Sequence, residues 1–248
     1  MSENTTDFGY QRVEPGRKTR LVDAVFGSVA GRYDLMNDLM SLGVHRLWKR
    51  FAVARLNLRR GEKVLDLAAG TGDLTRLAAD AVGPTGRVVA CDPNASMLAI
   101  GRDRSIDAGF LAEVGHVRAA GENLPFAGSA FDAVTIAFGL RNFTDKRAGL
   151  EEMCRVLRPG GRVMVLEFSH LVIPLLAKIY DRYSFSVIPW VGGRVTGDRE
   201  AYQYLVESIR RHPGQQELAD LMRAAGMDLV RWHNLSAGIV AVHLGWRV

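Results

Sequence analysis

The sequence lacks the features that mark several classes of protein. It has only 2 cysteines, Cys91 and Cys154, which are too few for a disulfide framework and do not have the spacing of zinc ligands. It has no apolar run long enough to cross a membrane, and its polar N-terminal residues differ from a secretory signal peptide. We therefore expect a protein of the cytoplasm that binds no metal.

Acidic residues are absent between Asp38 and Glu62, and basic residues gather in that stretch. Residues 1–60 carry 11 basic and 6 acidic side chains, a net charge of +5, whereas residues 61–248 carry 21 of each. The whole positive excess thus belongs to the N-terminal quarter. Such a surface favours an anionic partner, either a nucleic acid or an anionic membrane, unless it is an ordinary solvated helix face.

The composition fits one large α/β domain with appended segments. With 48% hydrophobic and 24% charged residues, a chain of 248 residues buries a large core but is short for two full domains. Apolar runs alternate with segments of helical periodicity, which is typical of parallel strands joined by crossover helices. The predicted strands are Lys63–Ala68, Arg87–Asp92, Gly115–Ala119, Ala130–Ala137 and Arg162–Phe168. The predicted helices are Asp73–Ala81, Ala95–Ala108, Lys146–Leu157, Asp198–Arg211 and Gln215–Ala225.

Two further strand-like runs, Met227–Asn234 and Gly238–Gly245, are separated by only a few residues. They predict an antiparallel hairpin at the end of an otherwise parallel sheet, which is a common arrangement.

Glycines follow the first predicted strand, and an acid ends the second. Gly70 and Gly72 allow the backbone to approach a ligand closely, and the helix that follows offers free amide donors. Leu74 stands where a dinucleotide-binding GxGxxG motif would have its third glycine, so a pyrophosphate ligand is disfavoured. Asp92 can accept both hydroxyls of a ribose, although a helix-capping or solvated role would also explain it.

These motifs belong to an ordered set. Its members are the Asp66–Asp73 glycine segment, the acid of Cys91-Asp92-Pro93, the Gly121–Phe126 loop, the Ser129–Asp132 strand entry and the Leu157–Gly161 turn. The set resembles the motifs of S-adenosylmethionine-dependent class I methyltransferases. The resemblance implies a Rossmann-like seven-stranded sheet and S-adenosylmethionine as co-substrate. It implies co-substrate contacts from Asp66, Gly70, Thr71, Gly72, Asp92, Ala120, Gly121, Glu122 and Ala137. Ala137 and Ala120 stand where relatives often carry serine and asparagine, so backbone contacts are expected from these two.

The flanking segments are similar to a narrower group, the ubiquinone/menaquinone biosynthesis C-methyltransferases. The similarity is carried by an N-terminal part and by several later segments. The N-terminal part is Val25–Ser41, Gly43, His45-Arg46 and Trp48-Lys49, and the later segments are Phe138–Asn142, Leu166–Ser169, Tyr180-Asp181, Tyr183–Phe185, Pro189 and Tyr202–Pro213. The similarity implies methyl transfer to a ring carbon of a polyprenylated hydroquinone, either demethylmenaquinol or 2-methoxy-6-polyprenyl-1,4-benzoquinol or both. We expect a helical cap and substrate segment over residues 1–60 and a methyltransferase domain over residues 61–248, with a cap insertion at about 170–213.

Four residues are candidates for the catalytic side of the site. Arg141 follows the fourth strand at the carboxyl edge of the sheet, where open α/β sheets bind ligands. Its guanidinium is suited to stabilise a developing phenolate or to hold a water that removes the proton, although an ion pair with a surface acid would make it structural. Asn142 can orient the same hydroxyl, and Tyr33 and Asp34 come from the N-terminal segment. The general base is left open.

The prenyl tail requires an apolar path, and the runs Leu171–Tyr180 and Phe185–Trp190 either provide one or form ordinary core. A tail held in the bilayer implies peripheral docking at the inner face of the membrane through the basic N-terminal surface. A homodimer and other enzymes of quinone biosynthesis are further candidate partners, whereas nucleic acid is not expected. The alternatives are a methyltransferase of RNA or another small molecule and a non-catalytic binding protein.

Overall fold

The computed structural model describes residues 5–32, 35, 37–38, 41, 43–110, 113–172 and 199–248, without the side chains of Val29, Arg32 and Arg199. Within this part, a seven-stranded sheet has the order β5-β4-β3-β6-β7-β9-β8, and a two-stranded hairpin, β1-β2, stands apart from it. The strands from β5 to β7 are parallel, and β9 pairs antiparallel with both β7 and β8. The predicted fold class is therefore confirmed.

The elements follow one another in the predicted rhythm. The parallel strands are β3 (Lys63–Leu67), β4 (Arg87–Cys91), β5 (Val114–Val117), β6 (Phe131–Ala137) and β7 (Leu157–Phe168). The helices between them are α4 (Asp73–Val82), α5 (Ala95–Asp107) and α6 (Lys146–Val156). The C-terminal elements are α9 (Arg199–Arg210), α10 (Gln215–Ala224), β8 (Asp228–Leu235) and β9 (Val240–Trp246). The N-terminal elements are β1 (Thr6–Phe8), β2 (Gln11–Val13), α1 (Pro15–Val29) and α3 (His45–Leu56).

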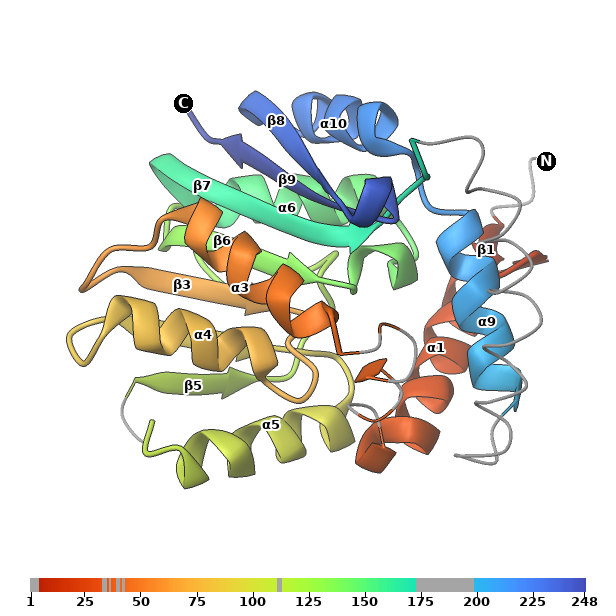
Figure 1. Ribbon diagram of the computed structural model, residues 1–248, viewed down its shortest axis with the longest axis horizontal. Coiled ribbons are helices and arrows are strands. Elements are labelled where there is room, and N and C mark those ends of the chain that lie inside the picture. Colours follow the sequence, from red (N-terminus) through yellow and green to blue (C-terminus); the bar gives the residue numbers. More distant parts are fainter. Residues whose placement is uncertain are drawn as a thin grey trace.

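Two apolar clusters cover the two faces of the sheet, because alternate residues of each buried strand point to opposite sides. On one face, α3 and α4 bury Leu56 and Ala78 against Val64 and Met164. On the other face, α6 and α10 contribute to a second cluster around Leu65. Figure 1 shows α3 and α4 in front of the sheet and α6 behind it. The sheet is thus held between two helical layers.

An asparagine caps the start of α5, whereas the start of β7 differs from the prediction. Asn94 accepts a hydrogen bond from the backbone N–H of Met97 at 2.9 Å, as its N-cap position predicts. The sequence predicts a turn over Leu157–Gly161 before a strand that begins at Arg162, whereas β7 already begins at Leu157. A register shift against β6 absorbs the extra residues, because Phe131 pairs with Leu157 and Ala133 with Arg162.

The N-terminal elements stand at the carboxyl ends of the parallel strands. Figure 1 shows α1, α9 and β1 beside the ends to which the arrows of β3, β6 and β7 point. Ligands bind at this edge in open α/β sheets. The candidates Tyr33 and Asp34, and residues 173–198 of the expected cap insertion, lie outside the described residues.

Candidate functional site

A cavity of about 570 Å³ opens at the carboxyl edge of the sheet. Its volume falls within the range of roughly 300–1,000 Å³ that is typical of small-molecule sites. The ends of β3, β4, β6 and the loop after β5 form its floor, and one side of α1 forms a wall. The predicted site residues that line it are Gly70, Asp92, Ala120, Gly121, Glu122, Ala137 and Asn142. Separate loops thus bring seven of the predicted residues together.

The loop after β3 bends sharply at its start. Ala68, Gly70 and Gly72 all have positive φ, of 51°, 55° and 82°, and for Ala68 this left-handed conformation is costly. Gly72 is the N-cap of α4, and its N–H donates to the carbonyl of Ala69 at 3.0 Å. This bend places Gly70 in the wall of the cavity, while Thr71 is buried behind it.

Asp92 is held at the tip of β4 by two backbone donors. Its carboxylate accepts from the N–H of Gly70 at 2.9 Å and from that of Asn94 at 2.8 Å, one on each oxygen. Burial raises the pKa of Asp92 to about 6, and the two hydrogen bonds oppose that rise. Asp92 is thus ionised near pH 7 and fixed in orientation, and each oxygen retains a lone pair for a ligand.

The acid of β3 has different surroundings. Asp66 is only 1% exposed and accepts hydrogen bonds from the hydroxyls of Thr75 at 2.5 Å and Thr135 at 2.9 Å. Burial raises its pKa to about 6. The cavity does not include Asp66, because its side chain points into the helical layer and ties β3 to α4 and β6. Thr71 and Gly72 are likewise outside the lining, and cofactor contact by these three stays a prediction.

The loop after β5 is fixed by a contact with the loop after β6. Glu122 accepts from the N–H of Thr144 at 2.8 Å. Gly121 lies so close to the ring of Phe143 that a Cβ added to it would be 2.2 Å from Phe143 Cζ. The backbone at Gly121 therefore has no space for a side chain.

Helix α1 supplies a wall that sequence reasoning did not predict. Thr19, Arg20, Asp23 and Phe26 line the cavity from one side of this helix. The helix is attached to the segment that follows β4, because the Asn94 amide donates to Asp23 Oδ1 at 2.8 Å. Among these residues, the sequence had drawn attention only to Phe26, which lies in the N-terminal segment that carries the family similarity. That similarity did not indicate which side of α1 faces the cavity.

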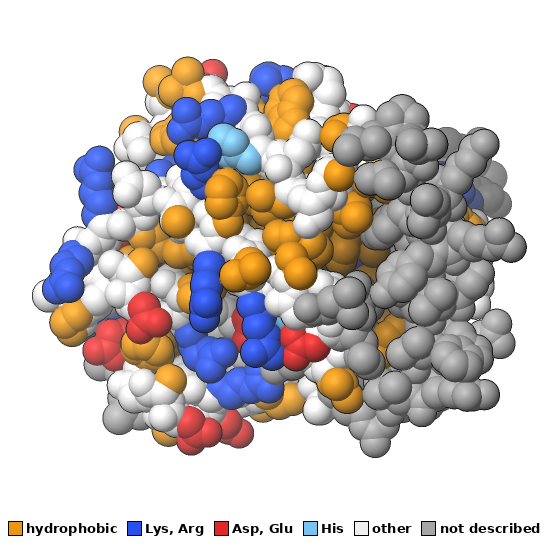
Figure 2. Space-filling view, in the orientation of Figure 1, with side chains coloured by type: hydrophobic (Ala, Val, Ile, Leu, Met, Phe, Trp, Pro, Cys, Tyr) orange, Lys and Arg blue, Asp and Glu red, His pale blue; other side chains and the backbone are white. Residues whose placement is uncertain are grey.

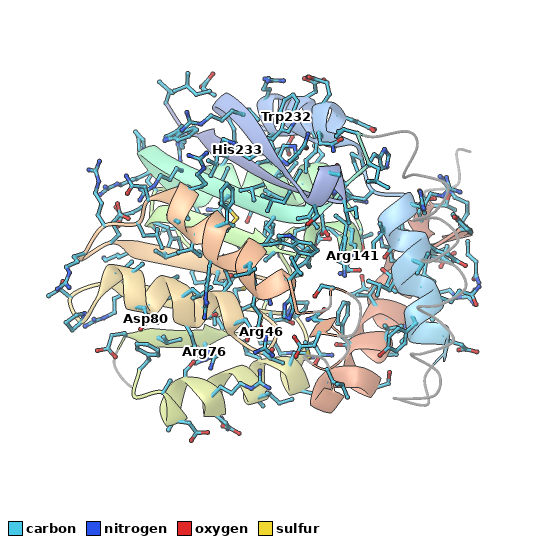
Figure 3. The ribbon with its side chains drawn as sticks, viewed as in Figure 1. Arg46, Arg76, Asp80, Arg141, Trp232 and His233 are labelled. Carbon is cyan, nitrogen blue, oxygen red and sulfur yellow. The ribbon has the colours of Figure 1, made fainter. Side chains whose placement is uncertain are left out.

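Arg141 occupies a buried ion pair. It belongs to a short 3₁₀ turn, Leu140–Asn142, after β6, and its Nη1 donates to Glu167 Oε1 at 2.9 Å and to the carbonyl of Phe138. The side chains of Arg141 and Glu167 are 3% and 1% exposed. Figure 3 shows Arg141 at the carboxyl edge of the sheet, on the side of α1 and α9. The expected structural alternative was a surface acid, whereas the partner is buried and belongs to β7.

Asn142 faces the cavity and is held from the opposite side. Its Oδ1 accepts from the hydroxyl of Tyr204 in α9 at 3.0 Å, and Tyr204 stacks on Phe8 at a centroid distance of 4.2 Å. The Asn142 amide nitrogen forms no hydrogen bond within the described residues and borders the cavity. The sequence did not indicate this contact, because Tyr204 lies 62 positions away from Asn142 along the chain.

Sequence comparison identifies the family. The model of the ubiE/COQ5 methyltransferase family matches residues 14–247. The chain belongs to this family. The ubiquinone/menaquinone biosynthesis C-methyltransferase UbiE of Pseudomonas savastanoi pv. phaseolicola is 55% identical over 98% of this chain and 95% of its own. The enzyme of the same name from Stutzerimonas stutzeri is 54% identical with the same coverage. The predicted recognition is therefore confirmed.

Solved structures agree on the fold. A S-adenosylmethionine-dependent methyltransferase from Thermotoga maritima has a TM-score of 0.62 at 19% identity, and covers 90% of this chain and 100% of its own. A S-adenosylmethionine-dependent methyltransferase from Aquifex aeolicus has a TM-score of 0.57 at 15% identity, with 95% and 100% coverage. The seven-stranded arrangement is that of class I methyltransferases, and the family is one of S-adenosylmethionine-dependent C-methyltransferases.

The described residues contain neither a membrane-spanning helix nor a cluster of metal ligands. No helix there is long and apolar enough to cross a membrane. No group of three or more His, Cys, Asp or Glu side chains in the same part of the chain is arranged to hold a metal ion.

Proposed function

We propose that this chain transfers the methyl group of S-adenosylmethionine to a ring carbon of a polyprenylated hydroquinone, a demethylmenaquinol or a 2-methoxy-6-polyprenyl-1,4-benzoquinol. The observation that carries the proposal is the single cavity lined by Gly70, Asp92, Gly121 and Asn142, which come from four separate strand ends. Its family membership and the names of its relatives support the substrate class.

The residues present fit S-adenosylmethionine. Asp92 would accept the ribose hydroxyls, and Gly70 leaves the backbone open to close approach. The charged side chains of the lining are the carboxylates of Asp23, Asp92, Glu122 and Asp145 and the guanidiniums of Arg20 and Arg118. This excess of negative charge suits a co-substrate whose sulfonium and ammonium groups outnumber its carboxylate. The sulfonium supplies an activated methyl group.

The hydroquinone requires activation by proton removal. Loss of a proton from the hydroxyl next to the reacting carbon makes that carbon enolate-like, and it then attacks the methyl group in line. The new C–C bond forms as the S–CH₃ bond breaks, with its electron pair going to sulfur. The ring carbon then loses its hydrogen as a proton and the ring oxygen regains the proton that it lost, so the products are a methylated hydroquinone, S-adenosylhomocysteine and one proton. No covalent enzyme intermediate is needed.

Asn142 and Arg141 have different roles toward the substrate. The free amide N–H of Asn142 borders the cavity and is suited to donate to the substrate oxygen. Arg141 is locked by Glu167, so its positive charge stabilises developing phenolate from a fixed position. This arrangement favours electrostatic stabilisation by Arg141 over direct proton transfer, because Glu167 and Phe138 already hold its Nη1 in place.

The prenyl tail of the substrate bears on where in the cell the protein acts. A tail that remains in the bilayer would require peripheral contact at the inner face of the membrane, and the basic N-terminal surface supports such contact by its charge. The cell compartment would then be the cytoplasm, where the substrate ring is within reach.

The test is incubation of the purified protein with labelled S-adenosylmethionine and each reduced demethyl-quinone, followed by analysis for C-methylated product. The expected result is product with at least one quinol, and strong loss of product in Arg141→Ala protein that remains folded. Labelling of RNA without labelling of either quinol would replace this proposal by the RNA methyltransferase. Binding of S-adenosylmethionine without turnover of any acceptor would favour a binding protein.

A further inference from the structure

A second cleft, of about 610 Å³, lies outside the co-substrate cavity, between the N-terminal half of α3, the helix α4 and the end of α5. None of its lining residues also lines the co-substrate cavity. Figure 2 shows Lys and Arg side chains gathered over α4 and the start of α3, beside an exposed apolar area. Figure 3 places Arg46, Arg76 and Asp80 on this side of the molecule.

The charge of the cleft is positive. Its cationic side chains are Arg46, Lys49, Arg50, Arg76 and Arg104, and its carboxylates are Asp73 and Asp80, which leaves a net charge of +3 among the lining residues. Arg46 also pairs with Asp38, outside the lining, at 2.7 Å. His45 also lines the cleft and is neutral near pH 7, because burial lowers its pKa. The positive excess that the sequence assigns to the N-terminal quarter is thus partly collected in one concave site.

The ion pairs within the cleft leave donors for an anion. Asp73 serves two cations at once, with Lys49 Nζ at 2.9 Å and Arg76 Nη2 at 3.2 Å. The Nε–H of Arg76 is buried without a hydrogen-bond acceptor, and Arg50 forms no ion pair with any described residue. A phosphate oxygen in the cleft would provide the missing acceptors.

Apolar side chains accompany these cations. Leu77, Ala108 and Phe110 line the cleft itself. Leu47, on the same helix as Arg46 and Arg50, is 61% exposed. The apolar face of α3 packs against the sheet, and Leu47 lies outside that face, so its side chain can enter a membrane interface beside these cations.

We propose that this cleft binds the phosphate headgroup of an anionic phospholipid, so that the start of α3 rests on the membrane and Leu47 enters its interface. The proposal rests on the proposed function, since a bilayer-held quinol is the reason for docking. Asp73 is the first residue of α4 and follows the glycine loop directly, so the docked helix is joined to the co-substrate site through the Lys49–Asp73 ion pair.

A lipid headgroup fits this cleft better than a nucleic acid does. Single-stranded nucleic acids are held by cations that track several phosphates and by exposed aromatic rings on which bases stack. Here two carboxylates stand among the cations, and the single aromatic side chain among the cleft residues, Phe110, is only partly exposed. One phosphate can contact the cations without touching either carboxylate, whereas a polyanion that runs along the cleft would meet both of them.

The experiment measures binding of the full-length protein to phosphatidylcholine vesicles with and without phosphatidylglycerol. Wild type is expected to partition at least tenfold more strongly to vesicles with phosphatidylglycerol, and added salt weakens this preference. Arg50→Gln combined with Arg104→Gln removes one cation from each of two walls. Each basic residue near an anionic surface is worth about 1 kcal/mol, or about fivefold, so the pair should lower partitioning about 25-fold.

The matched control is Arg147→Gln combined with Arg223→Gln. Both arginines are exposed, each pairs with one carboxylate, and they lie on α6 and α10, away from the cleft. The net charge changes by the same amount, so a loss in the control equal to that in the cleft variant would overturn the proposal. Equal binding of wild type to both vesicle types would overturn it as well. RNA binding that is stronger than vesicle binding at equal salt, and that the cleft variant loses, would make the cleft a nucleic-acid site instead.

Methyl transfer to a detergent-dispersed, short-chain demethyl-quinol separates the two proposals. The cleft variant should keep wild-type activity on this substrate and lose activity on quinol embedded in anionic vesicles. If wild type fails to methylate the dispersed quinol, the proposed function fails whatever the vesicles show. If it succeeds but the cleft variant binds vesicles as wild type does, only the headgroup site fails.

Discussion

Substitution of Tyr204 by phenylalanine tests whether α9 positions the Asn142 amide, which we propose binds the substrate. The change removes the hydroxyl that donates to Asn142 Oδ1 at 3.0 Å and keeps the ring that stacks on Phe8. The net contribution of such a hydrogen bond to stability is roughly 0.5–1.5 kcal/mol. Asn142 borders the cavity, so water can satisfy its oxygen, and we expect the free energy of unfolding to fall by about 0.5 kcal/mol, at the low end of that range.

The effect on activity should be larger than the effect on stability. Without Tyr204 the Asn142 amide can rotate, and its N–H is no longer held toward the cavity. If this costs about 1.4 kcal/mol of transition-state stabilisation, kcat/KM falls about tenfold, mainly through kcat. Affinity for S-adenosylmethionine should stay near wild type, because the co-substrate contacts on β3 and β4 are unchanged.

The assay is a double-mutant cycle with Asn142→Ala, measured by methyl transfer to a short-chain demethyl-quinol. Tyr204→Phe should have little further effect once Asn142 is removed. An equal loss of kcat in both backgrounds, or a loss that follows urea stability alone, would refute the positioning role.

Three further outcomes are expected. Glu167→Gln leaves the buried Arg141 guanidinium without a counter-charge, so the free energy of unfolding in urea should fall by roughly 3–5 kcal/mol; a loss below about 1 kcal/mol would contradict a dry ion pair. The folded pKa of Asp66 is about 6, above its ordinary value of 3.8, so the folded state binds more protons and its stability falls as pH rises from about 4 to about 6. Asp66→Asn should abolish about 3 kcal/mol of that pH dependence in urea titrations, and an unchanged profile would show that the carboxylate is not desolvated. Gly121→Ala forces a Cβ into Phe143 and should weaken S-adenosylmethionine binding at least tenfold by calorimetry, whereas Gly115→Ala, which meets only open space, should not; equal affinities would mean that the loop moves freely.

The sequence predicts the sheet and one side of the site well, for a topological reason. Parallel strands bring their carboxyl ends to one edge, so Gly70, Asp92 and Gly121 had to lie near each other once the strands were recognised. Periodicity also located α4, α5 and α6 to within a residue or two. These features depend on local pattern and on one handedness rule.

The rest depends on packing between distant segments. The three-residue strands of the β1-β2 hairpin are too short for an alternating pattern, and no local signal directs α1 over the cavity. Arg141 was located correctly at the sheet edge, but its pairing with Glu167 depends on which face of β7 that acid occupies. The hydrogen bonds from the hydroxyls of Thr75 and Thr135 to Asp66 also depend on packing between segments, and contact of Asp66 with the co-substrate stays a prediction.

The antiparallel strand β9 has a consequence for the order in which the molecule is completed during synthesis. It is inserted between β7 and β8, and Ala241 pairs with Glu167, the residue that holds Arg141. Until residues 240–246 emerge from the ribosome, β7 is an open edge with unpaired backbone groups, and a chaperone or another nascent chain can pair with it. Arg141 therefore gains its final support only after all other strands of the described sheet have been made.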